Sequence, residues 1–397
     1  MLEPAAFLAA ISKSGVLAPE LERNLVAWSK AMAASSELIG THALAQKWLT
    51  PYQIQRLHTG KGHKLTFGPY LVLDILGEGG MGRVYQARHR RMGREVALKV
   101  IRRERVSNAQ VVRRFQQEVR AVGQMMHPNI VLAVDADSVG STHFVAMELI
   151  EGVDFAKLVE AHGPMPQPVA CEYVRQVAVG LQHAFEHGMV HRDIKPSNLM
   201  VTRGGIVKIL DFGLALLNEP DPRVKADRVT LEGFVLGTPD YLAPEQASNP
   251  QMVDSRADLY ALGGTLFFLL SGRIPYDGPT AMAKLLRHAN DPPPSVRQWR
   301  PDLPPQLDGL IQWLMAKRPE QRPQVPLQVA AALQAFCRMP QPTVGAESSQ
   351  AFRIPTSEAS QRKPVVKSSP WSIIIAMGVL LGTVALAAIV MKKLNYF

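Results

Sequence analysis

The sequence predicts a protein of the α+β class, in which a small β-rich lobe precedes a larger helical lobe. Three short β-prone runs, 70–76, 84–87 and 95–101, surround a cluster of glycines. Helical periodicity follows from about 107 to 126 and dominates from about 165 to 340. This order places the strands and most of the helices in separate lobes of one large domain.

Length and composition are those of an ordinary folded protein. The 397 residues are 47% hydrophobic and 20% charged, which excludes wholesale disorder, a collagen-like repeat and a coiled-coil rod. The formal charge of +10 suits anionic partners such as phosphates, acidic lipid or nucleic acid, and it equally suits a solvated basic surface. Because Cys171 and Cys337 are the only cysteines, we expect neither a disulfide framework nor a zinc site.

The chain divides into segments of different composition. Residues 1–66 predict a helical N-terminal extension, in which Pro51 begins a helix through Leu57. The extension carries no chemical motif, so we interpret it as a packing or docking appendage. Residues 70–337 hold the two lobes. Residues 338–370 are rich in Pro and Ser and poor in large apolar side chains, which predicts a disordered linker.

Residues 371–391 are typical of a transmembrane helix. None of them is charged, and as a helix rising about 1.5 Å per residue they would span roughly 31 Å. The hydrocarbon core of a bilayer is about 30 Å thick. Lysines flank both ends of the run, and a short tail, 392–397, follows it. We expect a single-pass membrane anchor; a buried core helix is the alternative.

The first chemical signal is a glycine-rich turn between two strand patterns. Glycines at 77, 79 and 82 let backbone N–H groups approach phosphate oxygens closely. The same spacing occurs in dinucleotide-binding folds, but there a helix follows the last glycine, whereas here a strand pattern follows. Lys99, on the next strand pattern, can reach the same phosphates. Glu118, on the following helical pattern, can hold the lysine charged and oriented.

A second group of signals lies in the helical lobe. The run from His191 to Asn198 places a carboxylate, a lysine and an amide in one loop. Asp193 can accept a hydroxyl proton, Lys195 can neutralise a transferring phosphoryl group, and Asn198 can offer an oxygen to Mg²⁺. Asp211, in Asp-Phe-Gly, supplies a second oxygen ligand. Residues 237–245 have the sequence Gly-Thr-Pro-Asp-Tyr-Leu-Ala-Pro-Glu.

In this order and at these spacings, the five motifs resemble the signature set of a protein kinase. The resemblance covers about residues 70–337. It implies the two-lobed protein kinase fold, to which the helical extension and the transmembrane helix are added. Lys195 close to Asp193 is typical of serine/threonine kinases. The compact motif at 237–246, followed by a C-terminal span, is similar to bacterial eukaryotic-like serine/threonine kinases.

The resemblance implies an ATP site under the glycine-rich turn. Its residues would cover the phosphates, close the back of the adenine pocket with Met147, form the hinge and sandwich the base. They are Leu76, Gly77, Glu78, Gly79, Gly80, Met81, Gly82, Arg83, Val84, Ala97, Lys99, Met147, Glu148, Ile150 and Met200.

Catalytic and supporting roles follow from the same resemblance. The residues implied to act in catalysis are Asp193 as the base, Lys195, and the paired Lys99 and Glu118. Those implied to bind Mg²⁺ or Mn²⁺ are Asn198 and Asp211. Those implied to support the helical lobe are Glu245 paired with Arg322, and Asp258 beneath the catalytic loop.

One regulatory site is implied by the resemblance together with the residues between two of its motifs. Between Gly213 and Gly237 the only hydroxyl side chain is Thr230. Arg192 precedes the catalytic Asp193, and a guanidinium pairs strongly with a phosphate group. We therefore expect autophosphorylation at Thr230.

The expected partners are ATP, proteins with serine and threonine hydroxyls, and the cell membrane, with the kinase domain facing the cytoplasm, where ATP is found. The sequence leaves a homodimer of kinase domains open. Nucleic acid is not expected, because no basic platform interleaved with aromatic residues occurs. A catalytically silent kinase-fold scaffold is the main alternative, but such proteins usually lack one of the charged residues, and here all are present.

Overall fold

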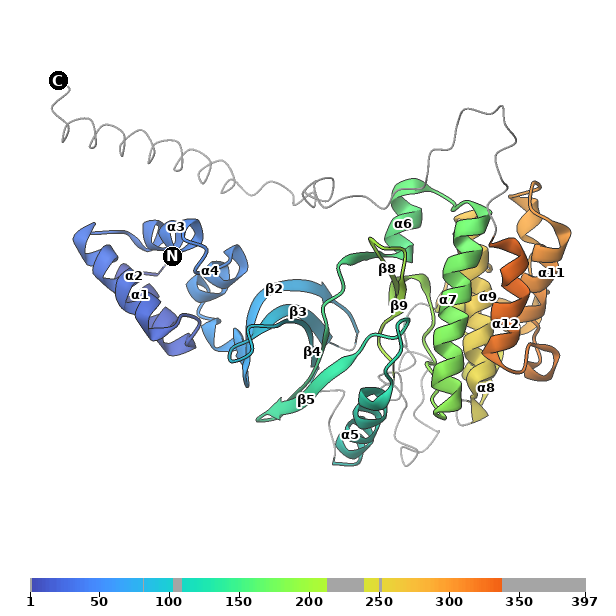
Figure 1. The fold of residues 1–397 in the computed structure, drawn as a ribbon, viewed down its shortest axis with the longest axis horizontal. Helices are drawn as coiled ribbons and strands as arrows, with labels where there is room; N and C mark the ends of the chain where they lie inside the picture. Colours follow the sequence, from blue (N-terminus) through green and yellow to red (C-terminus); the bar gives the residue numbers. More distant parts are fainter. Residues whose placement is uncertain (1, 81, 103–108, 213–238, 250–251, 338–397) are drawn as a thin grey trace, which may run out of the picture. The chain divides into compact units, whose positions relative to one another are not determined.

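The computed structural model describes residues 2–80, 82–102, 109–212, 239–249 and 252–337. Within these residues the two predicted lobes are present, the smaller built on a β-sheet and the larger on helices (Figure 1).

Some predictions fall outside the described residues. These are the role of Met81 at the tip of the glycine-rich turn, the phosphorylation of Thr230, the linker 338–370, the transmembrane helix 371–391 and the tail 392–397. Across the part of the chain that is described, no helix is both long and apolar enough to pass through a membrane.

The small lobe is built on a six-stranded antiparallel sheet with the strand order β1-β2-β3-β4-β6-β5. Helix α5, Ala109–Gln124, packs against β5 (Figure 1). The strands are β1 (Thr66–Phe67), β2 (Tyr70–Glu78), β3 (Gly82–His89), β4 (Glu95–Ile101), β5 (Ala133–Val139) and β6 (Thr142–Glu148).

The two faces of this sheet have different surroundings. Side chains alternate between the faces along each strand, and residues directly opposite on neighbouring strands share a face. The inner face points toward the candidate active site and carries Val84, Ala97, Lys99, Val145 and Met147. The other face belongs to a hydrophobic core and carries Tyr85, Val96, Leu98, Phe144 and Ala146.

The N-terminal extension covers that second face. Phe7, Ile11, Leu25, Ile39 and Leu57 are fully or almost fully buried in the same hydrophobic core as the strands. The extension and the sheet therefore bury one continuous apolar interior. Its helices are α1 (Pro4–Ser14), α2 (Pro19–Ala31), α3 (Ser36–Ala45) and α4 (Pro51–His58).

Helix α4 begins where the sequence predicts. Pro51 occupies its first turn, where the missing N–H costs no hydrogen bond. Thr50 and Gln53 form a capping box, in which each side chain accepts a hydrogen bond from the backbone N–H of the other. The predicted end at Leu57 differs from the observed His58 by one residue.

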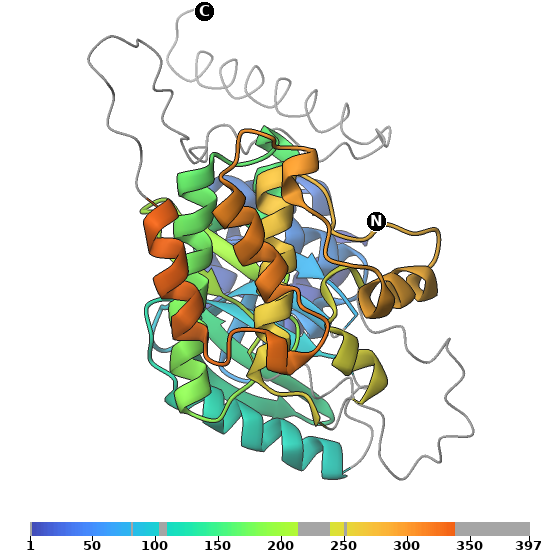
Figure 2. The same cartoon turned by 90° about the vertical axis from the view of Figure 1, so that its right-hand side faces the viewer.

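The large lobe combines a small sheet with a helical bundle (Figure 2). Its three antiparallel strands are β7 (Gly152–Asp154), β8 (Leu199–Thr202) and β9 (Val207–Ile209). Its helices are α6 (Phe155–His162), α7 (Gln167–Glu186), α8 (Pro244–Ser248), α9 (Ser255–Ser271), α10 (Ala281–Asn290), α11 (Pro305–Leu314) and α12 (Pro326–Leu333).

Helix α9 is the centre of the large lobe. It is apolar on nearly all sides, and it packs against both α7 and α11. A Cβ added at Gly263 would lie 2.7 Å from the Cβ of Leu314, so the glycine permits the close approach of α9 and α11. This rigid interior supports the loop that carries Asp193.

Candidate active site

The glycine-rich turn joins β2 to β3 as a tight hairpin. The N–H of Gly79 donates to the carbonyl of Gly82 at 2.9 Å, and the N–H of Gly82 donates back at 3.3 Å. A Cβ at Gly82 would lie 2.0 Å from the carbonyl oxygen of Val100, so any side chain there would collide with β4. Arg83 Nε lies 3.1 Å from Glu78 Oε2 across the hairpin. The predicted turn therefore forms, and glycine is needed at 82.

The apolar residues expected around adenine lie on the same side of the sheet as Lys99. Val84 is directly opposite Lys99 on β3, and Ala97 precedes it by two residues on β4. Met147, on β6, is directly opposite Ala97. Met200 comes from β8, in the other lobe. The sandwich of the base between these residues stays a prediction.

Lys99 is joined to the large lobe by a buried ion pair. Its Nζ lies 2.8 Å from Asp211 Oδ1, and the lysine side chain is only 5% exposed. Burial opposes the negative charge on Asp211, but the charge of Lys99 and its hydrogen bond outweigh it and lower the pKa of Asp211. Glu118 lies half-buried on α5. Its predicted pairing with Lys99 stays a prediction.

The space between α5 and the sheet closes around Phe212. A small cavity remains there, lined by Val119, Val122, Val131, Ala133, Val145, Met147, Asp211 and Phe212. Phe212 is 5% exposed, and its ring packs edge-on against His191 with 4.6 Å between centroids. The phenylalanine beside Asp211 thus connects α5 with the catalytic loop.

The catalytic loop brings three of the predicted residues together. Lys195 Nζ lies 2.9 and 2.8 Å from the two carboxylate oxygens of Asp193. Asn198 Nδ2 donates to the carbonyl of Asp193 at 2.8 Å and to its Oδ2 at 2.9 Å. Because the amide nitrogen of Asn198 makes both bonds, its oxygen Oδ1 is the atom that suits a cation.

Asp258 holds this loop from below. Its carboxylate accepts hydrogen bonds of 2.7 Å from the backbone N–H groups of His191 and Arg192. Arg192 has φ 66°, a left-handed conformation that is costly for a residue with a side chain. Burial raises the pKa of Asp258, and nearby His191 and the two backbone bonds oppose that rise. The strained turn therefore depends on a carboxylate from the central helix α9.

His191 links the catalytic loop to the segment that carries Asp211. Its Nε2 donates to the carbonyl of Leu210 at 2.6 Å, and its Nδ1 accepts from the N–H of Asp193 at 3.2 Å. These two bonds together assign the proton to Nε2. One imidazole thus fixes the spacing of the two carboxylates that the sequence singles out, Asp193 and Asp211.

The predicted hinge follows β6. The side chain of Glu148 accepts a hydrogen bond from the N–H of Leu132 at 2.9 Å, and its Oε1 lies 2.7 Å from Lys208 Nζ. Glu148 therefore ties the hinge to the residue before β5 and to β9. Ile150 is half-buried two residues later. The adenine contacts of Glu148 and Ile150 stay predictions.

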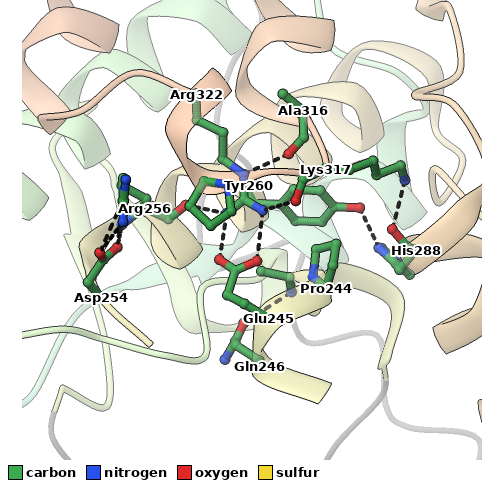
Figure 3. A network of polar contacts seen from close by, with 12 residues as sticks. Pro244, Glu245, Gln246, Asp254, Arg256, Tyr260, His288, Ala316, Lys317 and Arg322 are labelled. Atoms are coloured by element: carbon green, nitrogen blue, oxygen red, sulfur yellow. Dashed lines mark hydrogen bonds and ion pairs between the residues drawn. The ribbon is translucent and has the colours of Figure 1, made fainter. Parts of the chain in front are cut away.

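A second buried ion pair anchors α8 in the large lobe (Figure 3). The guanidinium of Arg322 makes bonds of 2.6 and 2.7 Å to the two oxygens of Glu245. It also donates to the carbonyls of Ala316, Lys317 and Arg256, at 2.7, 2.9 and 3.0 Å. The expected pair is confirmed, and every donor group of this fully buried arginine has an acceptor.

A polar cluster lies next to this ion pair (Figure 3). The hydroxyl of Tyr260 lies 2.8 Å from Nδ1 of His288, whose Nε2 lies 3.1 Å from the carbonyl of Asp240. Lys284 Nζ lies 2.6 Å from Asp240 Oδ1. Burial, with the nearby charge of Lys317, lowers the pKa of His288 to about 4, so its ring is neutral at pH 7. The cluster holds the segment before α8 against α9 and α10.

Several supporting residues were missed by sequence reasoning. Gln246 donates from Nε2 to the carbonyl of Arg192 at 2.9 Å, so it joins α8 to the catalytic loop. Lys208 pairs with Glu148, and His288 supports Asp240. Gln246 could have been found from its place directly after the Ala-Pro-Glu motif. Lys208 and His288 carry no comparable local signal.

The site offers oxygen ligands for a hard cation. Asn198 and Asp211 both follow Asp193 in the chain and supply an amide and a carboxylate oxygen. Nowhere in the described residues do three His, Cys, Asp or Glu side chains form a metal site of their own. Two protein oxygens are what Mg²⁺ commonly uses when phosphates and water complete its shell, so this donor set fits it.

Comparison with known families identifies the chain. The protein kinase domain family matches residues 70–334, more than half of the sequence. The chain belongs to the protein kinase family. The two-lobed protein kinase fold predicted from the motifs is thereby confirmed.

Named relatives of this kinase domain are bacterial. The serine/threonine-protein kinase PrkC of Bacillus subtilis is 35% identical over 64% of the chain and 38% of its own length. The serine/threonine-protein kinase pkn3 of Myxococcus xanthus is 36% identical over 67% of the chain and 49% of its own length. The kinase therefore matches less than half the length of these curated relatives.

A solved kinase structure has a similar fold. The PknI kinase domain of Mycobacterium tuberculosis is 28% identical, with a TM-score of 0.55, over 68% of this chain and 97% of that one.

Proposed function

We propose that this protein transfers the γ-phosphoryl group of ATP to serine and threonine hydroxyls of proteins. One observation carries the proposal. Lys99 of the sheet and Asp211 of the large lobe form an ion pair of 2.8 Å, and His191 joins the Asp211 segment to the Asp193 loop. Side chains far apart in the sequence therefore surround one space, as phosphoryl transfer requires.

Each residue has a role in the proposed reaction. Asp193 accepts the proton of the substrate hydroxyl while that oxygen bonds to the γ-phosphorus. The bond from the γ-phosphorus to the bridging oxygen breaks, and its electron pair leaves with ADP. Lys195, already 2.8 Å from Asp193, is placed to neutralise charge on the transferring group. Lys99 orients the phosphates from the sheet.

The proposed metal would be held by Asn198 and Asp211. When bound, Mg²⁺ neutralises the negative charge of the phosphates. The protein contributes the orientation of its two ligands. Asn198 is fixed by its two hydrogen bonds to Asp193, and Asp211 by its ion pair with Lys99.

The function is tested with the full chain, Mg²⁺, γ-labelled ATP and a generic protein substrate. We expect label on phosphoserine and phosphothreonine after acid hydrolysis, and none without divalent metal. Label on phosphotyrosine alone would contradict the serine/threonine assignment. Tight binding of an ATP analogue without any transfer would favour the silent scaffold.

We further propose that Thr230 is the autophosphorylation site. Thr230 is the only hydroxyl residue between the Asp-Phe-Gly and Gly-Thr-Pro motifs, and Arg192 offers a guanidinium beside the catalytic base. Mass spectrometry of the protein after incubation with Mg²⁺ and ATP should find one phosphate on Thr230. Thr230→Ala should remove that phosphate and lower activity. Phosphate on other residues with Thr230 bare would overturn this assignment.

We also propose that residues 371–391 anchor the protein in the cell membrane. The absence of charge over this run supports a span, and the need for ATP places the kinase domain on the cytoplasmic side. In inverted vesicles, protease should cleave residues 70–337 and spare a tag at residue 397. Release of the intact chain by high salt would contradict a span.

A further inference from the structure

We propose that helix α4 clamps strand β2 just before the glycine-rich turn, so that Thr50 and Gln53 are positioning residues for nucleotide binding. This inference rests on the proposed kinase function. It assigns a role to the N-terminal extension, which contains none of the kinase motifs.

Strand β2 needs support on one side because it is nearly an edge strand. On that side β1 pairs only through Thr66 and Phe67, which lie opposite Leu71 and Tyr70. The last backbone bond from this side joins the N–H of Val72 to the carbonyl of Leu65 at 2.9 Å. Helix α4 packs against β2 where this pairing ends (Figure 1).

The pairing of β2 with β3 on its other side is irregular at the same place. Val72 lies opposite Ala87, but the next pair joins Asp74 to Gln86, so Leu73 has no counterpart on β3. Such a bulge bends a strand and leaves backbone groups out of the ladder. The carbonyls of Val72 and Leu73 therefore need hydrogen-bond donors from outside the sheet.

The two capping residues of α4 make those contacts. The hydroxyl of Thr50 donates to the carbonyl of Leu73 at 2.5 Å. Gln53 Nε2 donates to the carbonyl of Val72 at 2.7 Å, and the glutamine is only 1% exposed. Two consecutive carbonyls at the bulge are thus satisfied by two side chains of one helix.

Both side chains are held rigidly by their own helix. Gln53 Oε1 accepts from the N–H of Thr50 at 2.9 Å, and Thr50 Oγ1 accepts from the N–H of Gln53 at 3.2 Å. Each group is therefore bound to the helix as acceptor and to the strand as donor. A helix terminus built in this way fixes the strand more firmly than a single surface contact.

The clamp is the last buried anchor before the turn. From Asp74 to Gly80 every residue is exposed, including Ile75 at 39% and Leu76 at 48%. Gly77 begins the glycine-rich turn four residues beyond Leu73. The orientation of the N–H groups of the turn consequently depends on the short exposed segment 74–76, which α4 holds at Val72 and Leu73.

We test the clamp with two variants in the full chain. Gln53→Glu keeps the acceptor for the Thr50 N–H but removes the donor to Val72. Thr50→Val removes the hydroxyl with little change in shape. We expect each to raise the KM for ATP by about three- to tenfold, the loss of one or two hydrogen bonds, and to change kcat by less than about twofold. Amide hydrogen exchange at residues 74–78 should become faster.

Matched controls separate positioning from general stability. Thr50→Ser keeps the hydroxyl and should keep the KM of the unaltered protein. Ser35→Ala removes the cap of α3, where the serine accepts from the N–H of Leu38 at 3.3 Å, away from β2. It should lower the melting temperature without changing the KM for ATP.

Two outcomes would overturn the clamp. One is an unchanged KM in Thr50→Val and Gln53→Glu. The other is an equal rise in KM for Ser35→Ala. If the unaltered chain transfers no phosphate, the proposed function fails, but hydrogen exchange at 74–78 and the affinity for an ATP analogue still decide on the clamp.

Discussion

Replacing Asp193 by asparagine lowers kcat by about 10²- to 10⁴-fold, the usual contribution of a positioned general base. An amide cannot take up the proton of the substrate hydroxyl. The variant keeps one oxygen in place for Lys195, which lies 2.8 to 2.9 Å from the two carboxylate oxygens of Asp193. We therefore expect the affinity for an ATP analogue to stay within about twofold. Initial rates and analogue titration measure both quantities.

The matched control is Asp291→Asn in the same lobe. Asp291 is exposed, and its nearest ion-pair distance, to Arg287, is 3.9 Å. This substitution should leave kcat and the melting temperature unchanged. More than about a tenth of normal activity in Asp193→Asn, with the control unaffected, would show that Asp193 is not the base.

The largest loss of stability is expected for Arg322→Met. The substitution leaves the Glu245 carboxylate, only 16% exposed, without its ionic partner and removes the arginine donor from three carbonyls. Removing one member of a buried ion pair typically costs about 3–5 kcal/mol. For a domain of this size we expect the melting temperature to fall by about 5–15 °C, as calorimetry can measure.

Two further variants test whether the loss of stability comes from the buried ion pair. Arg287→Met breaks a solvent-exposed pair at 3.9 Å and should cost less than about 1 kcal/mol. Glu245→Gln leaves the buried guanidinium uncompensated and should be almost as harmful as Arg322→Met. Because Gln246 bonds the Arg192 carbonyl from the same helix, we also expect lower kcat in both. Equal melting temperatures for Arg322→Met and Arg287→Met would contradict the proposed anchor.

The fold could be predicted largely from local patterns. The glycine-rich hairpin follows from a cluster of glycines within six residues, of which Gly82 has no room for a side chain beside Val100. The start of α4 follows from Thr50, Pro51 and Gln53, which form its cap within four residues. Such features depend on residues that are close together in the sequence, so the sequence alone is enough to predict them.

The supporting contacts could not be predicted in the same way. His288, Lys208 and Gln246 act on segments between 48 and 60 residues away. Only Gln246 has a local signal, its place directly after the Ala-Pro-Glu motif, and that signal does not name its partner. The partner of Lys99 belongs to this group. Its 2.8 Å contact with Asp211 depends on how the two lobes meet.

The sequence by itself determined the chemical groups of this kinase, because the type of each side chain decides which bonds it can make. It also determined the local turns and caps that depend on adjacent residues. The tertiary structure alone decided where those groups meet: Asp258 under the catalytic loop, Arg322 against Glu245, and the N-terminal helices over the outer face of the sheet. An apolar face or a hydrogen-bond donor could pair with many different groups, and only the packing of distant segments selects one of them.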